Sequence, residues 1–276
     1  MLAIARRARF SYALAAALAV GAGLVGPHRA AAQDMLQFLD LQSAEFTTAE
    51  MTRADIEALL AKAGPQETVD LSARRLNGLD LSGLDLRRAK LQSARINGTN
   101  LAGANLDGVV LDQAWGLKAD LSRASLKGAS LFATQLMGAA MRGADLSGAR
   151  IAADMSRADL SGARFDGADL SADMKNQSMG LMRGVLKSAD LRGASFQGAN
   201  LARVVLEFAT LKDASLRDAN LAGSELGGAD LTGSDVTGAN FEGADVNSAR
   251  LVGLRGREQA VALDLAKNLD RAVRDQ

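Results

Sequence analysis

The side chains that could carry out chemistry in this 276-residue sequence are almost all carboxylates. The chain has 32 acidic residues, no cysteine and a single histidine, His28. Without cysteine, disulfides, thiolate metal sites and cysteine nucleophiles are excluded. One histidine is too few for a histidine zinc site, and its predicted removal excludes histidine acid–base chemistry. Any catalysis would therefore depend on carboxylates alone.

The acids recur at regular positions, which favours a structural use of them. An Asp or Asn side chain caps the backbone of a turn, and we expect most acids to do this while keeping the surface solvated. Weak calcium binding between stacked carboxylates is an alternative, but no D-x-D-x-D-G loop supports it. A glycosidase pair would need two acids across a cleft. We predict no catalytic residue, no metal and no cofactor. The acids in question are Asp145, Asp166, Asp169, Asp230, Asp235 and Asp245.

The acids belong to a repeat that fills the middle of the chain. A large apolar residue returns at every fifth position from Leu71 to Leu251, in 37 units, and Gly116 is the exception. Alanine stands two residues before this centre in 25 units, with Asp or Asn commonest between them. The count slips by one residue at Met155 and runs long at residues 176–180, where we expect a protruding loop.

A period of five fits neither a helix nor a plain strand. The alanine and the centre are two residues apart and point to the same side of an extended chain. Glycine, frequent two places after the centre, tolerates a corner. Four units close a square coil of about 20 residues, and stacked coils pair their backbones. The predicted fold class is an all-β solenoid, a quadrilateral β-helix of about nine coils.

The strings Ala104-Asn105-Leu106 and Ala199-Asn200-Leu201 carry the motif A-(D/N)-L-x-x. In this motif the sequence resembles the pentapeptide-repeat family over residues 69–253. The resemblance implies a right-handed coil and a scaffold on which function is carried by separate sites. At residues 115–117 the pattern fails, and we expect a bulge that turns Leu117 inward in place of Gly116.

Both ends of a stack need covering, because open strand edges recruit other chains. Residues 33–68 are predicted to form an N-terminal helical cap, since the sequence TRAD at 52–55 is a capping box. Residues 254–276 are predicted to form a C-terminal helix. That helix either covers the last coil or forms a homodimer, as in some relatives of the family. Its apolar stripe, with a spacing of four, is Val261, Leu265, Leu269 and Val273.

Residues 1–32 are typical of a secretory signal peptide. Three early arginines are followed by an apolar run over 11–26 and by Ala30-Ala31-Ala32. An uncleaved anchor is the alternative, but the run is short for a membrane span of ~20 residues. We expect cleavage after Ala32, a periplasmic or secreted protein and no stable membrane span. The remaining chain has 28 basic and 32 acidic residues, a net charge of −4, which does not favour nucleic acid.

Outward apolar residues are the better candidates for a site. In a four-sided register Trp115, Leu117 and Met137 share one face of adjacent coils, Phe132 lies on the face before it, and Val110 is close by. Such a patch on a polar surface marks a protein-binding site. A bulge that buries Trp115 or Leu117 is the alternative. All five residues are protein-binding candidates.

Three functions fit these observations. The first is an exported, non-enzymatic structural or protein-binding scaffold with an unknown protein partner. The second is implied by the resemblance, since some family members mimic DNA and bind type II topoisomerases. The net charge of −4, the mixed signs and the export signal argue against it. The third is a carboxylate-only carbohydrate-active enzyme, which lacks an evident cleft.

Overall fold

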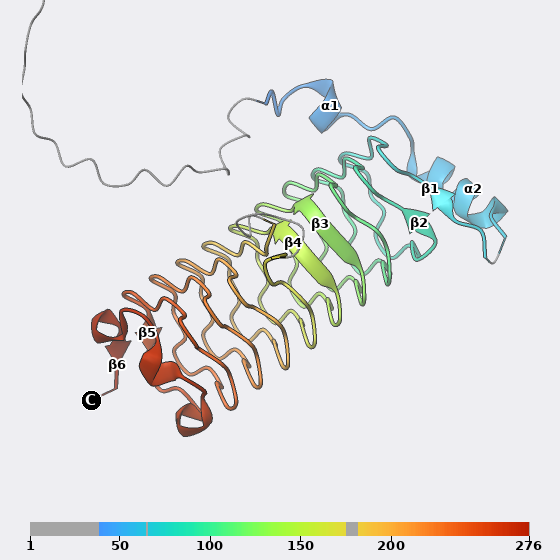
Figure 1. Cartoon of the computed structure of the whole chain (residues 1–276). Helices are drawn as coiled ribbons and strands as arrows, with labels where there is room; N and C mark the ends of the chain where they lie inside the picture. The colour runs from blue at the N-terminus through green and yellow to red at the C-terminus, as the bar shows by residue number, and fades with distance from the viewer. Residues whose placement is uncertain (1–38, 65, 175–181, 276) are drawn as a thin grey trace, which may run out of the picture. The chain divides into compact units, whose positions relative to one another are not determined.

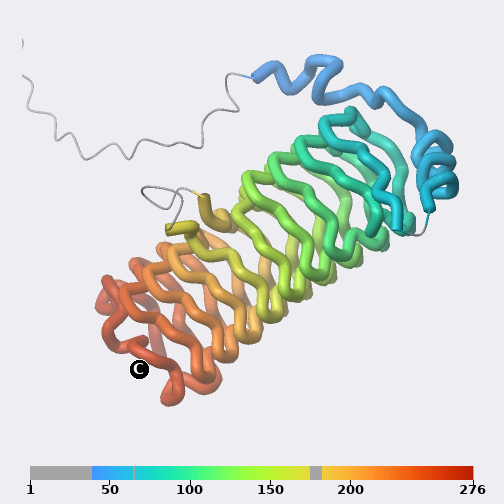
Figure 2. Tube along the Cα trace, turned by 45° about the vertical axis from the view of Figure 1, so that its right-hand side comes forward, coloured from blue at the N-terminus to red at the C-terminus, as the bar shows by residue number. Residues whose placement is uncertain are grey.

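The computed structural model describes residues 39–64, 66–174 and 182–275. The compact unit Leu41–Gln276 winds into stacked coils (Figures 1 and 2). Parallel bridges join Arg75 to Arg95 and Arg95 to Trp115, so that one coil takes twenty residues and four five-residue sides. The fold is therefore a quadrilateral β-helix. One bridged column runs through Arg75, Arg95, Trp115, Gln135, Asp154, Val185, Val205, Glu225, Asp245 and Lys267. The predicted signal peptide, residues 1–32, lies outside the described residues.

Regular elements are short because each side of a coil holds only one or two paired residues. Among the described residues, two α-helices precede the coils, and the strands pair in parallel as β1–β2, β3–β4 and β5–β6. The helices are α1 (Ala44–Thr47) and α2 (Arg53–Lys62), with the 3-10 helices η2 (Arg257–Gln259), η3 (Leu263–Leu265) and η4 (Leu269–Arg271) near the C-terminus. The strands are β1 (Val69–Asp70), β2 (Ala89–Lys90), β3 (Ser130–Gln135), β4 (Arg150–Asp154), β5 (Arg250–Leu251) and β6 (Val273–Arg274).

The backbone bonds of one unit explain the five-residue period. Leu121 N–H donates to Ala140 O of the next coil at 2.7 Å, and Arg123 N–H donates to Arg142 O at 2.9 Å. Ala124 N–H turns back to Leu121 O at 3.0 Å and closes the corner. Within each unit, some backbone N–H groups bond to the neighbouring coil and one bonds within the turn of the unit itself.

The corners need a left-handed residue two places after each centre. Gly103 has φ 65°, and glycine holds most of these positions because it has no Cβ to clash there. Other residues adopt the same conformation where the ladder imposes it, among them Arg123 and Phe208 at φ 57° and 58°. A left-handed residue other than glycine costs about 1–2 kcal/mol. The stacked coils therefore outweigh local preference at these corners.

The core consists of the unit centres and the inward alanines, which are almost completely buried. Each fully buried leucine contributes about 1.5–3 kcal/mol relative to an exposed one. Phe165 and Phe196 occupy centres in adjacent coils and stack with ring centroids 4.7 Å apart. Where Thr99 or Ser234 replaces an inward alanine, its hydroxyl donates to a carbonyl of the preceding coil, at 2.7 Å and 2.6 Å. Ser224 also replaces an inward alanine and is completely buried, but its hydroxyl has no hydrogen-bond partner among the described residues.

The bulge predicted at residues 115–117 is wrong. Trp115 bridges Arg95 and Gln135 in the regular ladder, and Gly116 occupies the inward centre. A Cβ on Gly116 would lie 2.9 Å from Leu136 Cδ2, because the side chains of the adjacent coils lean into its space. Leu117 stays outward and half-buried. The ladder fixes the direction of the backbone even where the centre has no side chain.

The one-residue slip before Met155 is confirmed by the β3–β4 pairing. Phe132 pairs with Ala152, whereas Gln135 pairs with Asp154, so β4 is one residue shorter. A left-handed corner is missing at Ala153, which is buried instead. The coil loses one residue here and keeps its inward column.

A longer excursion leaves the coil after Leu170. Gly184 N–H donates to Leu170 O at 2.9 Å. In a regular unit the alanine three residues after the centre makes this turn bond, so Gly184 takes the place of that alanine. The repeat counted onward from Met155 predicts an inward centre at Met174, but this side chain is 52% exposed, so that prediction is wrong. The predicted loop at residues 176–180 lies outside the described residues.

The helix predicted after Thr52 is present as α2. Thr52 and Asp55 cap each other's backbone N–H, and Ile56 is fully buried against the coils. Arg88 of the coils donates to Leu60 O at 3.0 Å and to Ala63 O at 3.1 Å. These are end carbonyls that have no partner within a helix.

The C-terminal helix predicted over residues 254–276 is wrong, and a homodimer through this segment stays a prediction without that helix. The chain continues to coil: Val261 bridges Asn240, Lys267 bridges Asp245, and β6 pairs with β5. Its units have six residues, each with a 3-10 corner. In the sequence, the sign of these coils is the spacing of six between Ala260, Ala266 and Ala272. The apolar residues spaced four apart predict a helix over the same segment.

Among the described residues, no helix combines the length and apolar composition needed to cross a membrane.

Leu146→Asp tests the inward assignment. Leu146 is completely buried, so we expect the unpaired charge to lower the free energy of unfolding by about 4 kcal/mol or more. Asp145→Ser, one position away and outward, is the matched control and should cost about 1 kcal/mol. Guanidinium denaturation measures both, and equal losses would contradict the assignment.

Candidate binding surfaces

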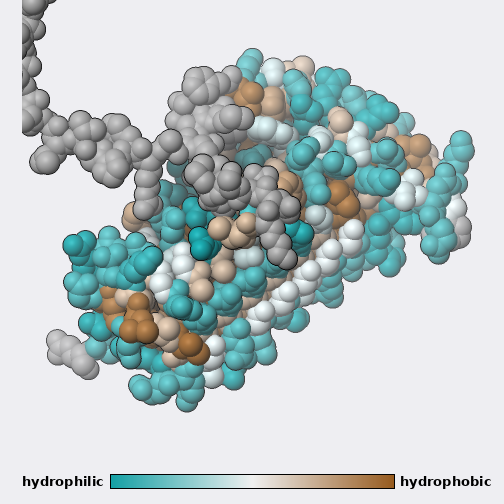
Figure 3. Space-filling view, viewed as in Figure 1, coloured by the Kyte–Doolittle hydropathy of each residue, from teal (hydrophilic) through white to brown (hydrophobic). Residues whose placement is uncertain are grey.

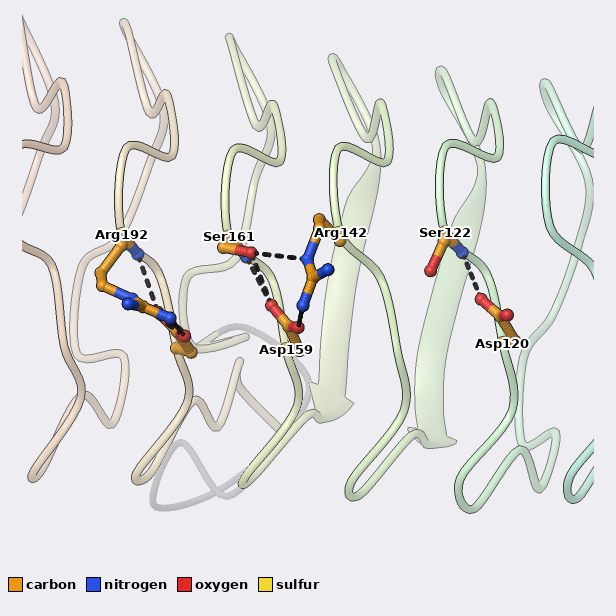
Figure 4. Close-up of polar contacts among 7 residues, drawn as sticks. Asp120, Ser122, Arg142, Asp159, Ser161 and Arg192 are labelled. Carbon is orange, nitrogen blue, oxygen red and sulfur yellow. Dashed lines mark hydrogen bonds and ion pairs between the residues drawn. The ribbon is translucent and has the colours of Figure 1, made fainter.

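One backbone N–H in each five-residue unit is left without a ladder partner, and an Asp or Asn at the outward position accepts it where one is present. Ser122 N–H donates to Asp120 Oδ1 at 2.9 Å, and Ser161 N–H donates to Asp159 Oδ1 at 3.1 Å (Figure 4). Ser147 makes the same bond to Asp145 at 3.0 Å. This capping role is the one expected from the sequence.

In several units whose outward position lacks Asp or Asn, the preceding coil supplies the acceptor. Leu117 N–H donates to Asn97 Oδ1 at 2.9 Å, and Phe132 N–H donates to Asp112 Oδ1 at 2.9 Å. Lys127 N–H donates to Asp107 Oδ1 at 3.0 Å. The same polar groups thus stabilise the corners through two geometries.

Basic side chains complete the carboxylate ladder. Arg142 Nη2 lies 2.6 Å from Asp159 Oδ2, and Arg192 Nη2 lies 2.5 Å from Asp190 Oδ2 (Figure 4). Surface pairs of this kind contribute little each, but they keep the acids charged.

The pKa values follow from these contacts. Hydrogen bonds from the Arg87 side chain lower the pKa of Asp85 to about 2. Burial raises the pKa of Asp159, but the bonds from Ser161 and Arg142 outweigh it and the net pKa lies below its ordinary value. A carboxyl held ionised in this way is a poor general acid, which needs a raised pKa.

The five predicted site residues all lie outward and half-buried, but on more than one side of the coil. Leu117 and Met137 occupy the same corner of consecutive coils, tied by the bond from Lys118 N–H to Met137 O at 3.1 Å. Trp115 lies on the side that leads to this corner. Phe132 lies at the corner that comes before the side holding Gln135, the bridge partner of Trp115. Val110 lies on a different side of the coil, where it bridges Lys90 and Ser130. The structure therefore brings Trp115, Leu117 and Met137 together and leaves Val110 apart.

Trp115 is covered by a residue that no sequence pattern predicts at this place. Phe46 of α1 packs against it edge to face, with ring centroids 5.3 Å apart. The two residues are far apart in the chain, and α1 belongs to no repeat unit. Only the folded chain reveals this contact.

Phe132 lines a cavity of about 400 Å³ at the base of the excursion. Met174, Met182, Arg150 and Asp173 also line this cavity. Arg150 Nη2 lies 3.5 Å from Asp173 Oδ2. No motif in the sequence predicts this cavity, although the long repeat count at residues 176–180 lies next to it in the chain.

Two further apolar features are exposed. Phe208 is 61% exposed at a left-handed corner, where its ring rests over Gly228 and Lys187 Nζ lies 5.8 Å from the ring centroid. Apolar side chains also gather at the C-terminal end of the coils (Figure 3). These are Val261, Leu265 and Val273, of which Leu265 is 75% exposed.

Comparison with known proteins agrees with the repeat. The family model described as Pentapeptide repeats matches in eight copies, over residues 69–171 and 185–253. Its matches cover residues 69–101, 94–131, 117–151, 151–171, 185–218 and 214–253. No curated protein matches the chain significantly.

Solved structures include similar chains. HetL, a pentapeptide repeat protein involved in heterocyst differentiation regulation in the cyanobacterium Nostoc sp., is 29% identical, with 80% of this chain and 96% of HetL covered and a TM-score of 0.42. QnrB1, a plasmid-mediated fluoroquinolone resistance protein, is 16% identical, with 76% and 93% covered and a TM-score of 0.36. Rfr23 from the cyanobacterium Cyanothece is 23% identical, with 45% and 88% covered and a TM-score of 0.28.

The lowered carboxyl pKa values predict acid sensitivity. An unfolded Asp titrates near about 3.9, above the folded pKa of about 2 at Asp85, so the folded chain binds fewer protons. The stabilisation is complete above about pH 4 and is lost as the pH falls through the folded pKa. Melting temperature measured from pH 7 to pH 2 should fall in that window. Asp85→Asn should make the fall shallower, and an unchanged profile would contradict the role of Asp85.

Proposed function

Because the chain belongs to the pentapeptide-repeat family, we propose that it is an exported, non-enzymatic protein-binding scaffold. Its coils supply a rigid surface, and its carboxylates serve the turns. Binding then falls to the outward apolar side chains, since apolar patches on a polar surface favour protein contacts.

The corner made by Leu117 and Met137 carries this proposal. The two side chains lie in consecutive coils beside Trp115, and both remain half-exposed. Their neighbours along the same column are polar, with Asn97 before them and Ser156 after them. A local apolar corner with polar neighbours resembles the core and rim of a protein interface.

A photo-crosslinking amino acid at Met137 tests the contact in living cells. We expect one defined adduct heavier than the chain, and we expect Leu117→Asp to reduce its yield at least tenfold. The same crosslinker at Lys127, an exposed residue of a different corner, is the matched control. Equal adducts at both positions, or none at Met137, would refute this assignment.

Export is the second part of the proposal, and it is supported by the composition of residues 1–32. Cell fractionation with intact-mass measurement should find a chain that begins near Gln33 in the periplasm or medium. An intact Met1 in the cytoplasm would contradict export, and it would favour the topoisomerase-binding alternative that the family resemblance implies.

A further inference from the structure

Residues 43–50, here called the strap, lie outside the repeat and cross the side of the first coils. The strap contains α1, which has only four residues, no side-chain N-cap bond and no buried residue. A helix of one turn does not persist on its own in water. The conformation of the strap therefore depends on its contacts with the coils.

Two stacked asparagines hold the backbone of the strap. Asn77 Nδ2 donates to Glu45 O at 3.1 Å and to Thr48 O at 3.2 Å, and Asn97 Nδ2 lies 3.4 Å from Phe46 O. Asn77 is only 4% exposed beneath the strap. Its own Oδ1 accepts from the backbone and side-chain nitrogens of Asn97, at 3.1 Å and 3.0 Å. This pair recognises the carbonyls of a helical turn, whatever its side chains are.

Arg95 and Trp115 select the side chains of that turn. Arg95 forms an ion pair with Glu45, and its guanidinium carbon lies 5.6 Å from the centre of the Phe46 ring. The same ring meets Trp115 edge to face. Arg95 Nε is buried and has no hydrogen-bond partner among the described residues. An acid followed directly by an aromatic residue therefore pairs with Arg95 Nη2 and covers Trp115, although Arg95 Nε stays unbonded. Either residue alone would leave the Arg95 charge or the Trp115 ring without its partner.

The downstream end of the strap is anchored separately. Glu50 N–H donates to Arg75 O at 2.9 Å, and the Glu50 carboxylate lies 3.3 Å from Arg74 Nη1 and 3.4 Å from Arg75 Nε. None of these contacts involves Glu45 or Phe46. The turn of α1 can leave its site while Glu50 keeps the chain attached.

The apolar surface also extends beyond the strap. Leu117 follows Trp115, and Asn97 bonds the Leu117 N–H as well as facing Phe46 O. Leu117 and Met137 remain half-exposed next to a site that holds a single helical turn. A longer segment would cover them in addition to Trp115.

We propose that Asn77, Arg95, Asn97 and Trp115 form a docking site for a protein segment that presents Glu followed by Phe in a helical turn, and that the strap occupies this site in the absence of the partner. The inference rests on the proposed binding role of the Trp115 surface, and it names the chemistry of the partner. The strap then competes with the partner, and the apparent affinity equals the intrinsic affinity multiplied by the fraction of chains with a vacant site.

Fluorescence anisotropy with a labelled peptide of residues 41–51 (LQSAEFTTAEM) tests the site on the full chain. We expect Glu45→Ala/Phe46→Ala in the chain to tighten peptide binding at least tenfold, because the strap no longer competes. Thr47→Ala is the matched control, since the Thr47 hydroxyl donates to Ser43 O within the strap. It should leave peptide binding as in the unaltered chain.

A charge reversal checks the pairing on the variant with the weakened strap. Arg95→Glu should abolish binding of the unaltered peptide and restore binding of the same peptide with Glu45→Lys. No gain from the strap variant, or binding that ignores both charge changes, would overturn the proposal and leave the strap as a fixed cover. That result would not affect the crosslink at Met137, so failure of the site and failure of the proposed function are distinguishable.

Hydrogen exchange on the unaltered chain gives a second measurement that needs no variant. The amides of residues 44–47 should exchange at least a hundredfold faster than those of α2, and excess peptide should not slow the exchange in α2. Protection of the strap equal to that of α2 would also overturn the proposal.

Discussion

The requirement that every backbone N–H of a tightly wound chain find an acceptor shapes this protein more than any other constraint. The centre, the corner residue and the residue before the centre bond to neighbouring coils, and the inward alanine bonds within its own turn. In many units the N–H that remains is accepted by an Asp or Asn side chain, as at Asp120 and Asp159. The five-residue motif follows from this arrangement, because each of its positions provides one donor or acceptor of these hydrogen bonds.

This constraint also limits what the protein can do chemically. Carboxylates that cap turns and pair with Arg142 or Arg192 remain ionised and fixed in place. The features that vary between coils are the outward apolar side chains and the interruptions. Trp115, the cavity beside Phe132 and the corner at Phe208 are therefore where the coils differ from one another, and a partner would distinguish them there.

Segments outside the repeat decide how the two ends and one side are covered. α2 places Ile56 against the first coil, and Arg88 bonds the carbonyls at its end. The strap covers Trp115 through Phe46, and the last coil ends with Leu265 exposed. The N-terminal side is thus covered by the chain itself, whereas the C-terminal end presents apolar side chains.

The sequence by itself determined the coil, its inward columns, the turn-capping role of Asp and Asn, the slip at Met155 and the helix after Thr52. These features are local, because each follows from residues within about five positions of one another. Only the tertiary structure decided that Gly116 stays inward, since Leu136 and Ile96 of the adjacent coils fill its space. It also decided that residues 254–276 continue to coil, because pairing with the preceding coil outweighs a helical stripe. The contact between Phe46 and Trp115 joins parts of the chain that no periodicity relates, so it could be found only in the folded molecule.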